Sequence, residues 1–239
     1  MKKLWLALWV CAALLPRAAA LSAAAAVTMD ADTGETLFAE NADSRLPMAS
    51  TTKIMTALVA LGEGDLDRVY PVKKQYAAVE GSSMYLEEGE RLTLRDTLYG
   101  LLLSSGNDAA AAVAGECGGE RAFVDKMNAK ARELGLTDTR FENPSGLPSD
   151  GHYTTARELA KITAAALRDP VFRDIVSTKT CTAAGRTLVN HNRLLSLYEG
   201  AIGVKTGFTR AAGRCLVSAA ERNGRTVIAV TLNDPDDWN

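Results

Sequence analysis

Hydrophobic and polar residues alternate with a period of two near both ends of the chain, which predicts strands there. Near the N-terminus, alternating runs flank the turn Asp32-Thr33-Gly34 and predict a hairpin over residues 25–41. Near the C-terminus, Asn223-Gly224 separates two such runs and is a strong hairpin signal. The strands expected there span residues 201–207, 215–221 and 226–232.

The residues between these ends follow a helical period instead. Ile54, Leu58 and Leu61 form an apolar stripe on a helix that begins at Ser50. Polar residues that commonly cap helices precede two later segments, Thr93 with Asp96 and Thr155 with Glu158. The helices expected are residues 50–61, 94–103, a helix from Asn107 or Asp108 to 117, 120–134 and 156–167.

The order of these elements predicts an α+β fold. A two-stranded hairpin is rarely stable alone, so we expect both chain ends to share one antiparallel sheet. Helices would flank this sheet, and a helical subdomain would be inserted at about residues 45–175. A cleft between the sheet and the subdomain is the expected place for a site.

The first twenty residues are typical of a secretory signal peptide. A basic start, MKK, precedes an apolar run that is short for a membrane span, and Ala18-Ala19-Ala20 offers a cleavage site. An uncleaved anchor is the alternative. We expect residues 21–239 to form one secreted, extracytoplasmic domain with no membrane association beyond the signal. Asp234-Pro235-Asp236-Asp237 is typical of a helix start, so we expect the chain to be truncated before its last helix.

Composition excludes several classes of function. Removing Lys2, Lys3 and Arg17 with the signal leaves 24 of the 27 basic residues against 29 acidic ones, a net charge of −5. No basic run is present, so no nucleic-acid partner is expected. The three remaining cysteines and two histidines match neither a disulfide framework nor a zinc set. We therefore expect no metal and no other cofactor.

Ser50 and Lys53 are the first candidate catalytic pair. Residues three apart share a helix face, so the hydroxyl and the amine can touch. Burial lowers the pKa of a lysine, and a neutral lysine can take the proton of a serine nucleophile. The alternative is that Ser50 only caps the helix while Lys53 extends to solvent.

Two further short motifs carry candidate polar groups. Ser105-Gly106-Asn107 falls in the break between two helices, where its side chains can enter a cleft; a simple turn in which Asn107 caps the next helix is the alternative. Lys205-Thr206-Gly207 ends a strand and can bind a carboxylate, with Gly207 allowing close backbone approach. An edge-strand lysine that blocks aggregation is the alternative.

The order S-x-x-K, S-x-N, K-T-G is the known signature of penicillin-binding proteins and class A β-lactamases. The chain resembles the low-molecular-mass penicillin-binding proteins, the serine-type D-alanyl-D-alanine carboxypeptidases, from about residue 24 onward. The likeness includes MDADTGETLFAENADSRLPMASTTKIMTALVAL, LLLSSGNDAA, DGHYTTARELAKI and GVKTGFTRAAGRCLVSAAERNGRTVIAVTLNDPDDW. It implies a β-lactamase/DD-peptidase-like fold with the site between sheet and helical subdomain.

The resemblance also implies a role for each motif residue. Ser50 would attack the carbonyl between two D-alanines, Lys53 would accept its proton, and Ser105 would relay a proton to the leaving amine. The substrate-binding groups implied are Asn107, Lys205, Thr206, Gly207, Phe208 and Thr209. Among them, the backbone N–H of Phe208 would join that of Ser50 in an oxyanion hole. The partners implied are peptidoglycan stem peptides and β-lactam antibiotics as covalent inhibitors.

Two other functions on the same fold stay open at this point. A weakly catalytic penicillin-binding or peptidoglycan-binding module would keep the motifs without turnover. A β-lactamase or esterase would hydrolyse other substrates, but the middle motif is S-G-N rather than S-D-N, and Glu142 lacks the surrounding lactamase pattern. His152 and His191 lie in segments that border the site in the family, and each could contact substrate or only pack.

Overall fold

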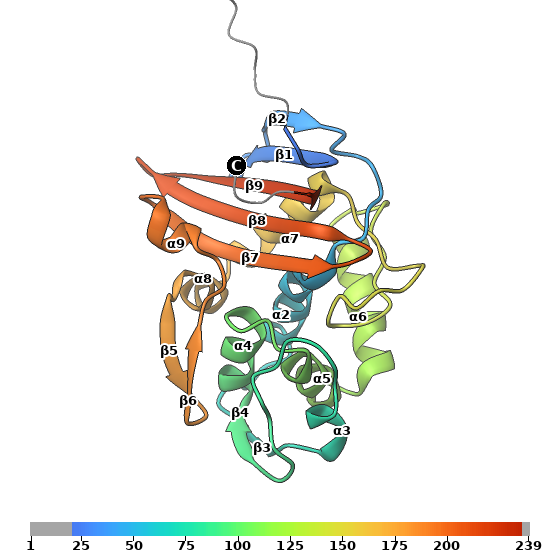
Figure 1. Cartoon of the computed structure of the whole chain (residues 1–239), viewed down its shortest axis with the longest axis vertical. Coiled ribbons are helices and arrows are strands. Elements are labelled where there is room, and N and C mark those ends of the chain that lie inside the picture. The colour runs from blue at the N-terminus through green and yellow to red at the C-terminus, as the bar shows by residue number, and fades with distance from the viewer. Residues whose placement is uncertain (1–20, 236–239) are drawn as a thin grey trace, which may run out of the picture.

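The computed structural model describes residues 21–235. The signal peptide predicted for residues 1–20, and Asp236 and Asp237 of the predicted helix start, lie outside the described residues. Asp234 ends a strand. The central feature is one antiparallel five-stranded sheet in the order β2-β1-β9-β8-β7 (Figure 1). Its strands are β1 (Ala25–Asp30), β2 (Thr36–Glu40), β7 (Ala201–Thr209), β8 (Gly213–Arg222) and β9 (Arg225–Asp234).

The two chain ends meet inside this sheet, as predicted. β1 pairs along its length with β9, from Ala25 opposite Leu232 to Asp30 opposite Val227. In β9, alternate residues are buried, and its buried apolar side chains Ile228, Val230 and Leu232 belong to the hydrophobic core. The Asp30 carboxylate also accepts hydrogen bonds from the Arg225 guanidinium, at 2.9 and 3.3 Å, which links the first hairpin to the last.

Helices occupy the rest of the described chain. α7 lies against β1 and β9, while α2 runs from the region of β7 into the helical part of the molecule (Figure 1). The larger helices are α2 (Lys53–Leu61), α4 (Leu94–Leu102), α5 (Asn107–Glu116), α6 (Glu120–Glu133), α7 (Ala156–Leu167) and α8 (Pro170–Ser177). The expected α+β architecture is therefore confirmed.

Local sequence signals explain where several helices begin. Thr93 and Asp96 form the predicted capping box, each side chain bonding the other's backbone N–H. The second predicted box is only half formed. The Thr155 hydroxyl accepts from the Glu158 N–H, but the Glu158 carboxylate instead accepts from Thr137, Asp138 and Thr139. These donors belong to a neighbouring loop, so the Glu158 carboxylate binds that loop instead of closing the capping box.

Several short elements were not predicted from the sequence. Two small two-stranded sheets lie outside the main sheet, and α8 begins at Pro170 after the cap Asp169. The short elements are β3 (Val69–Pro71), α3 (Lys74–Ala77), β4 (Arg91–Thr93), β5 (Thr180–Ala183), β6 (Arg186–Val189) and α9 (Leu194–Leu197). Arg186 connects β6 to the segment before β4, donating to the Glu90 carboxylate and the Tyr85 carbonyl.

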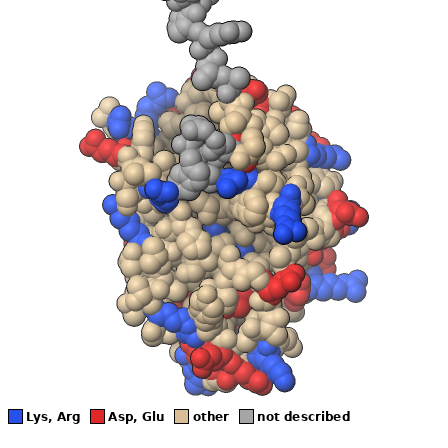
Figure 2. Space-filling model, viewed as in Figure 1, with Lys and Arg blue, Asp and Glu red and all other residues tan. Residues whose placement is uncertain are grey.

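The surface carries charges of both signs. On the face seen in Figure 2, basic and acidic side chains are interspersed, most of them toward the edges. None of the helices in residues 21–235 is long and apolar enough to cross a membrane.

Candidate active site

Ser50 lies in a tight turn rather than at the start of an α-helix. Residues Ala49–Thr52 form a short 3-10 helix, η1, and the α-helix α2 begins only at Lys53. The cap position before η1 is Met48, so the alternative in which Ser50 is the helix N-cap is wrong. Residues three apart line up in a 3-10 helix, so Ser50 still faces Lys53. Ala49 has a φ of 47°, which marks the turn as locally strained.

Lys53 is fully buried, which contradicts the alternative in which it extends to solvent. Its Nζ lies 2.9 Å from Ser50 Oγ, 2.8 Å from Asn107 Oδ1 and 2.7 Å from the Ser145 carbonyl oxygen. Burial lowers the pKa of Lys53 well below its usual range, and the nearby Lys205 ammonium lowers this pKa further, while Asp108 raises it.

These three contacts fit the neutral amine. A neutral lysine has two N–H donors and one lone pair. The Asn107 and Ser145 oxygens can only accept, so they take the two donors. The Ser50 hydroxyl is the one partner that can donate as well as accept, so in the neutral amine it would meet the lone pair. The arrangement therefore places the serine hydroxyl against a buried amine whose lowered pKa favours the form that can accept a proton.

Asn107 is the first residue of α5 and is buried. Gly106 takes the cap position, so Asn107 is not the capping residue of the alternative reading. Its Nδ2 donates to the Glu80 carbonyl (2.7 Å) and its backbone N–H to the Ser82 carbonyl (2.7 Å). With its Nδ2 and its backbone N–H bonded to this loop, its Oδ1 points at Lys53.

Asp108 organises the same loop, a role that the sequence analysis missed. The buried carboxylate accepts from the Ser83 hydroxyl and from the backbone N–H groups of Met84 and Leu86, at 2.6, 3.0 and 3.0 Å. The sequence feature that could have indicated this role is the position of Asp108 directly after Asn107 in the motif segment. The loop around residues 80–86 therefore forms a fixed wall beside Lys53.

Ser105 lies between α4 and α5, where the predicted break occurs. It is 5% exposed and has a φ of 59°, and within residues 21–235 no hydrogen bond partner is found for its hydroxyl. A left-handed conformation in a serine is uncommon and is typical of functional turns. The hydroxyl is therefore available to a substrate group.

β7 brings Lys205 and Thr206 to the same region. Lys205 is 1% exposed, and its Nζ donates to the Thr206 carbonyl at 2.8 Å. Burial lowers the pKa of Lys205 to about 7. It is a buried lysine rather than an exposed edge residue, so the aggregation-blocking alternative is wrong. Thr206 is half-buried and follows it directly.

Gly207 is where β7 passes closest to the serine turn. A Cβ atom there would lie 2.9 Å from Ser50 N and 3.1 Å from Thr51 N, closer than side chains tolerate. Phe208 is 60% exposed, with the Arg214 guanidinium 5.6 Å from its ring centre. The Thr209 hydroxyl accepts from the Ala212 N–H at 3.0 Å and so closes the turn after the strand.

The loop after α6 reaches the site from another side; the family resemblance indicated the His152 segment at the site's border, but not the contacts of Ser145 and Gly146. The Ser145 carbonyl accepts a hydrogen bond from Lys53. Gly146 lies against the serine turn, because a Cβ atom there would be 1.9 Å from the Ala49 carbonyl oxygen. Asn143 holds this loop, its Oδ1 accepting from the backbone N–H groups of Ser145 and Gly146. The loop therefore fixes both the base and the nucleophile.

His152 supports this loop from behind. It is buried; its Nδ1 accepts from the Glu142 N–H at 3.0 Å, so Nε2 carries the proton and donates to Thr52 Oγ1 at 2.8 Å. Burial lowers the pKa of His152 to about 4, which keeps it neutral. His191 is exposed, and its backbone N–H donates to the Leu103 carbonyl. Partial burial and the Lys205 ammonium lower the pKa of His191.

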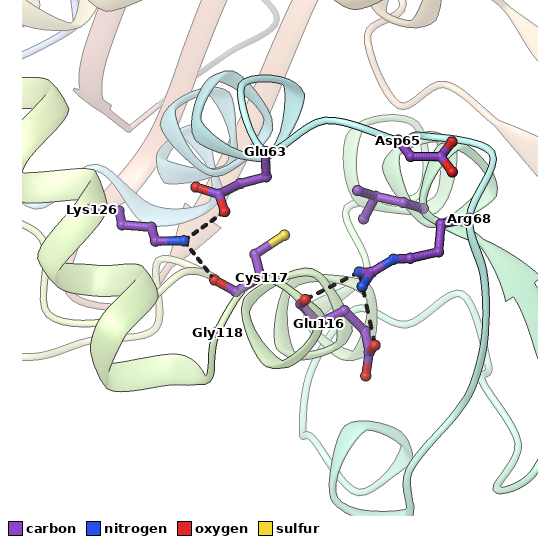
Figure 3. Close-up of a pocket in the computed structure, with 8 residues that line it drawn as sticks. Glu63, Asp65, Arg68, Glu116, Cys117, Gly118 and Lys126 are labelled. Carbon is purple, nitrogen blue, oxygen red and sulfur yellow. Dashed lines mark hydrogen bonds and ion pairs between the residues drawn. The ribbon is translucent and has the colours of Figure 1, made fainter.

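Two pockets accompany this arrangement. One of about 390 Å³ lies between the far ends of α2 and α5 (Figure 3). A helix of nine or ten residues is about 14 Å long, so this pocket is remote from Ser50. Its cations are already paired, Lys126 with Glu63 and Arg68 with Glu116. A second pocket, of about 340 Å³, adjoins the serine turn through Met48 and Ala49.

In the described part of the chain, no group of three or more histidine, cysteine, aspartate or glutamate residues could hold a metal ion. Cys117, Cys181 and Cys215 are free thiols.

Residues 12–236 match the family described as D-alanyl-D-alanine carboxypeptidase. The D-alanyl-D-alanine carboxypeptidase of Streptomyces sp. (strain K15) is 40% identical over 235 residues, which covers 89% of this chain and 81% of that protein. D-alanyl-D-alanine carboxypeptidase DacF of Bacillus subtilis (strain 168) is 40% identical over 221 residues, 88% of this chain and 57% of DacF. The chain thus spans less than two thirds of that longer relative.

Solved structures give the same grouping. Streptomyces K15 DD-transpeptidase matches with a TM-score of 0.86 at 39% identity, covering 90% of this chain and 91% of that one. A D-alanyl-D-alanine carboxypeptidase from Mycobacterium tuberculosis H37Rv matches with a TM-score of 0.84 at 38% identity, covering 88% and 82%. With its fold, its three motif segments and these relatives in agreement, the chain belongs to the D-alanyl-D-alanine carboxypeptidase family.

Proposed function

We propose that this chain removes the terminal D-alanine from peptidoglycan stem peptides through an acyl-enzyme formed on Ser50. One observation carries this assignment: Lys53 Nζ has two partners that can only accept and a third, the Ser50 hydroxyl, that can donate. A serine whose proton faces a buried neutral amine is an activated nucleophile. Membership of the D-alanyl-D-alanine carboxypeptidase family supports a substrate in the cell wall, outside the cytoplasm.

The acylation step follows from this arrangement. Ser50 Oγ attacks the carbonyl carbon between the two D-alanines while its proton passes to Lys53 Nζ. The negative oxygen of the tetrahedral intermediate would be held by the backbone N–H groups of Ser50 and Phe208. When the C–N bond breaks, the leaving amine takes a proton through the Ser105 hydroxyl, and D-alanine departs.

Substrate positioning falls to the residues around this centre. Lys205 and Thr206 would bind the terminal carboxylate, and Gly207 lets β7 run close enough to Ser50 for one short peptide to reach both. Asn107 Nδ2 carries two N–H donors and gives one to the Glu80 carbonyl, so the second would be offered to the carbonyl oxygen of a substrate amide. Water then hydrolyses the ester and restores Ser50.

β-Lactam antibiotics would acylate Ser50 by the same attack. In their case the broken C–N bond belongs to a ring, so the leaving amine stays attached and blocks the approach of water. We therefore expect a long-lived penicilloyl adduct. A β-lactamase would release it quickly. A non-catalytic binding module would form the adduct but would not release D-alanine from a peptide.

The test uses the mature chain with two substrates. Incubation with a peptide ending in D-Ala-D-Ala should release D-alanine, and intact mass spectrometry after penicillin treatment should place one adduct on the Ser50 peptide. Ser50→Ala should abolish both, whereas Ser196→Ala, which alters an exposed serine of α9 outside the motifs, should retain both. Labelling of Ser105, or labelling that survives in Ser50→Ala, would defeat the assignment.

Transfer to an amine is a second outcome of the same acyl-enzyme. It is favoured by the structural similarity to a protein named DD-transpeptidase. Adding a D-amino acid to the peptide assay separates the two outcomes, because transfer produces an exchanged peptide whereas hydrolysis produces a shortened one.

A further inference from the structure

The pocket of about 340 Å³ beside the serine turn is not used by the proposed reaction. Met48 and Ala49 form one wall, the loop of residues 146–150 forms another, and Thr209 and Ala211 at the end of β7 close it. It therefore opens next to the nucleophile on the side where β7 ends.

The direction of β7 fixes which part of the substrate meets this pocket. In the proposed function Lys205 and Thr206 hold the terminal carboxylate, and Phe208 contacts the reacting carbonyl. A strand advances about 3.3 Å per residue, so Thr209 and Ala211 lie beyond that carbonyl, away from the leaving D-alanine. An extended substrate beside β7 would place its acyl side there. The pocket is thus reached by the residue that precedes D-Ala-D-Ala.

The lining indicates the chemistry of that residue. Pro47, Met48, Leu147 and Pro148 provide an apolar surface suited to a methylene chain. Of the two charged side chains in the lining, Arg45 and Asp150, only Arg45 already has an ion-pair partner among the residues that the structure describes. The Arg45 guanidinium donates to the Asp138 carboxylate at 2.6 and 2.9 Å.

The remaining charge is negative. The exposed carboxylate of Asp150 lines the pocket and makes no hydrogen bond or ion pair with another residue in the range 21–235. Ser149, also in the lining, already donates to the Glu142 carboxylate. The pocket therefore offers an apolar wall and one unengaged carboxylate.

We propose that this pocket is a subsite for the residue preceding D-Ala-D-Ala, and that it takes an aliphatic side chain ending in an ammonium group paired with Asp150. This inference rests on the proposed function, because it uses the substrate direction assigned there. A lysine-type diamino acid has the required side chain.

The same loop connects the pocket to the reacting groups. Ser145, next to the pocket wall, holds Lys53 through its carbonyl, and Gly146 lies against the Ala49 carbonyl. A side chain in the pocket would therefore restrain the loop that positions the base. Binding energy from this remote part of the substrate would raise the acylation rate as well as affinity.

The experiment compares three N-acetylated peptides that differ only before D-Ala-D-Ala: L-lysine, ε-acetyl-L-lysine and L-norleucine. An ion pair at a partly exposed position strengthens binding about two- to fivefold. The lysine peptide should therefore have a kcat/KM about two- to fivefold above both others at low salt. Added salt should reduce this preference.

Asp150→Asn should lower the kcat/KM of the lysine peptide to that of the norleucine peptide. Asp32→Asn, which makes the same charge change in the exposed β1–β2 turn, should keep the preference. An equal preference in Asp150→Asn, or none in the unaltered protein, would overturn the inference. A diaminopimelate peptide that is preferred independently of Asp150 would also overturn it, because its carboxylate would then be the recognised group.

Competition of each peptide with labelled penicillin for Ser50 provides a second readout that needs no turnover. If no peptide is hydrolysed but the lysine peptide still protects Ser50 best, and only when Asp150 is present, the hydrolase assignment fails and the subsite stands. If hydrolysis occurs without a lysine preference in either readout, the subsite fails and the hydrolase assignment stands.

Discussion

Replacing Lys205 with methionine should make the protein more stable at neutral pH while destroying its reaction with penicillin. The lysine is 1% exposed, and burial lowers its pKa to about 7 from 10.5. Lys205→Met keeps an unbranched chain of similar length but removes the buried amine. The variant therefore separates the cost of burying this group from its use in substrate binding.

The sign of the effect follows from proton linkage. Between pH 7 and 10.5 the unfolded chain binds a proton at this lysine that the folded chain does not, so the free energy of unfolding increases with pH across that range. At 1.36 kcal/mol per pH unit the full penalty is about 5 kcal/mol, of which about 4 kcal/mol is present at pH 7. Losing the hydrogen bond to the Thr206 carbonyl costs about 1 kcal/mol. Lys205→Met should thus be more stable by about 3 kcal/mol at pH 7.

Urea unfolding of both proteins at pH 6, 7, 8, 9 and 10 and constant ionic strength measures this difference. In thermal unfolding at neutral pH, Lys205→Met should melt about 6 to 12 °C above the unaltered protein, given about 2–4 °C per kcal/mol for a chain of this size. By pH 10 the stability advantage should have disappeared. A variant that is less stable at every pH, or a difference that does not change with pH, would show that Lys205 is charged and paired in the folded protein.

Two other predictions concern the base and its support. Lys53→Arg keeps a positive charge that cannot be removed at useful pH, so the rate of penicillin acylation should fall by about 10²–10⁴-fold. The control Lys161→Arg, on the exposed face of α7, should be acylated at the normal rate. Near-normal acylation of a folded Lys53→Arg would show that another group is the base. Burial lowers the pKa of His152 to about 4 from 6.5, so the unfolded chain binds the extra proton between these values and stability should fall by about 3 kcal/mol from pH 6.5 to 4. His152→Gln should flatten that part of the urea-unfolding profile and His191→Gln should leave most of it, and an unchanged profile in His152→Gln would assign the acid sensitivity to carboxylates.

The sheet and the motif segments were predictable because their signals are local. Asn223-Gly224 and the turn at Gly34 fix two hairpins, and alternation fixes which residues face the core. The contact between Ser50 and Lys53 was predicted although the wrong helix type was assumed. Side chains three residues apart meet in either a 3-10 or an α-helix, so the error about the helix start did not affect the pair.

The groups that complete the site could not be predicted in this way. The Ser145 carbonyl contacts Lys53 across 92 residues. Because every residue has a backbone carbonyl, the sequence does not indicate which one makes this contact. Asp108 acts through loop N–H groups whose position depends on the folded chain. The hairpin β5–β6 was missed because its strands have four residues each and are largely exposed, so they show almost no alternation.

The position of β1 inside the sheet has a consequence for how the molecule is made. Ala25 is among the first described residues, yet its strand partner on one side is Leu232. Every catalytic motif has been synthesised by Thr209, but β7 joins the sheet only through β8, and β8 joins β1 only through β9. A nascent chain therefore carries all its reactive side chains long before it can align them. Folding of the active site must therefore wait until β9 has been synthesised, and contacts over such sequence distances form slowly.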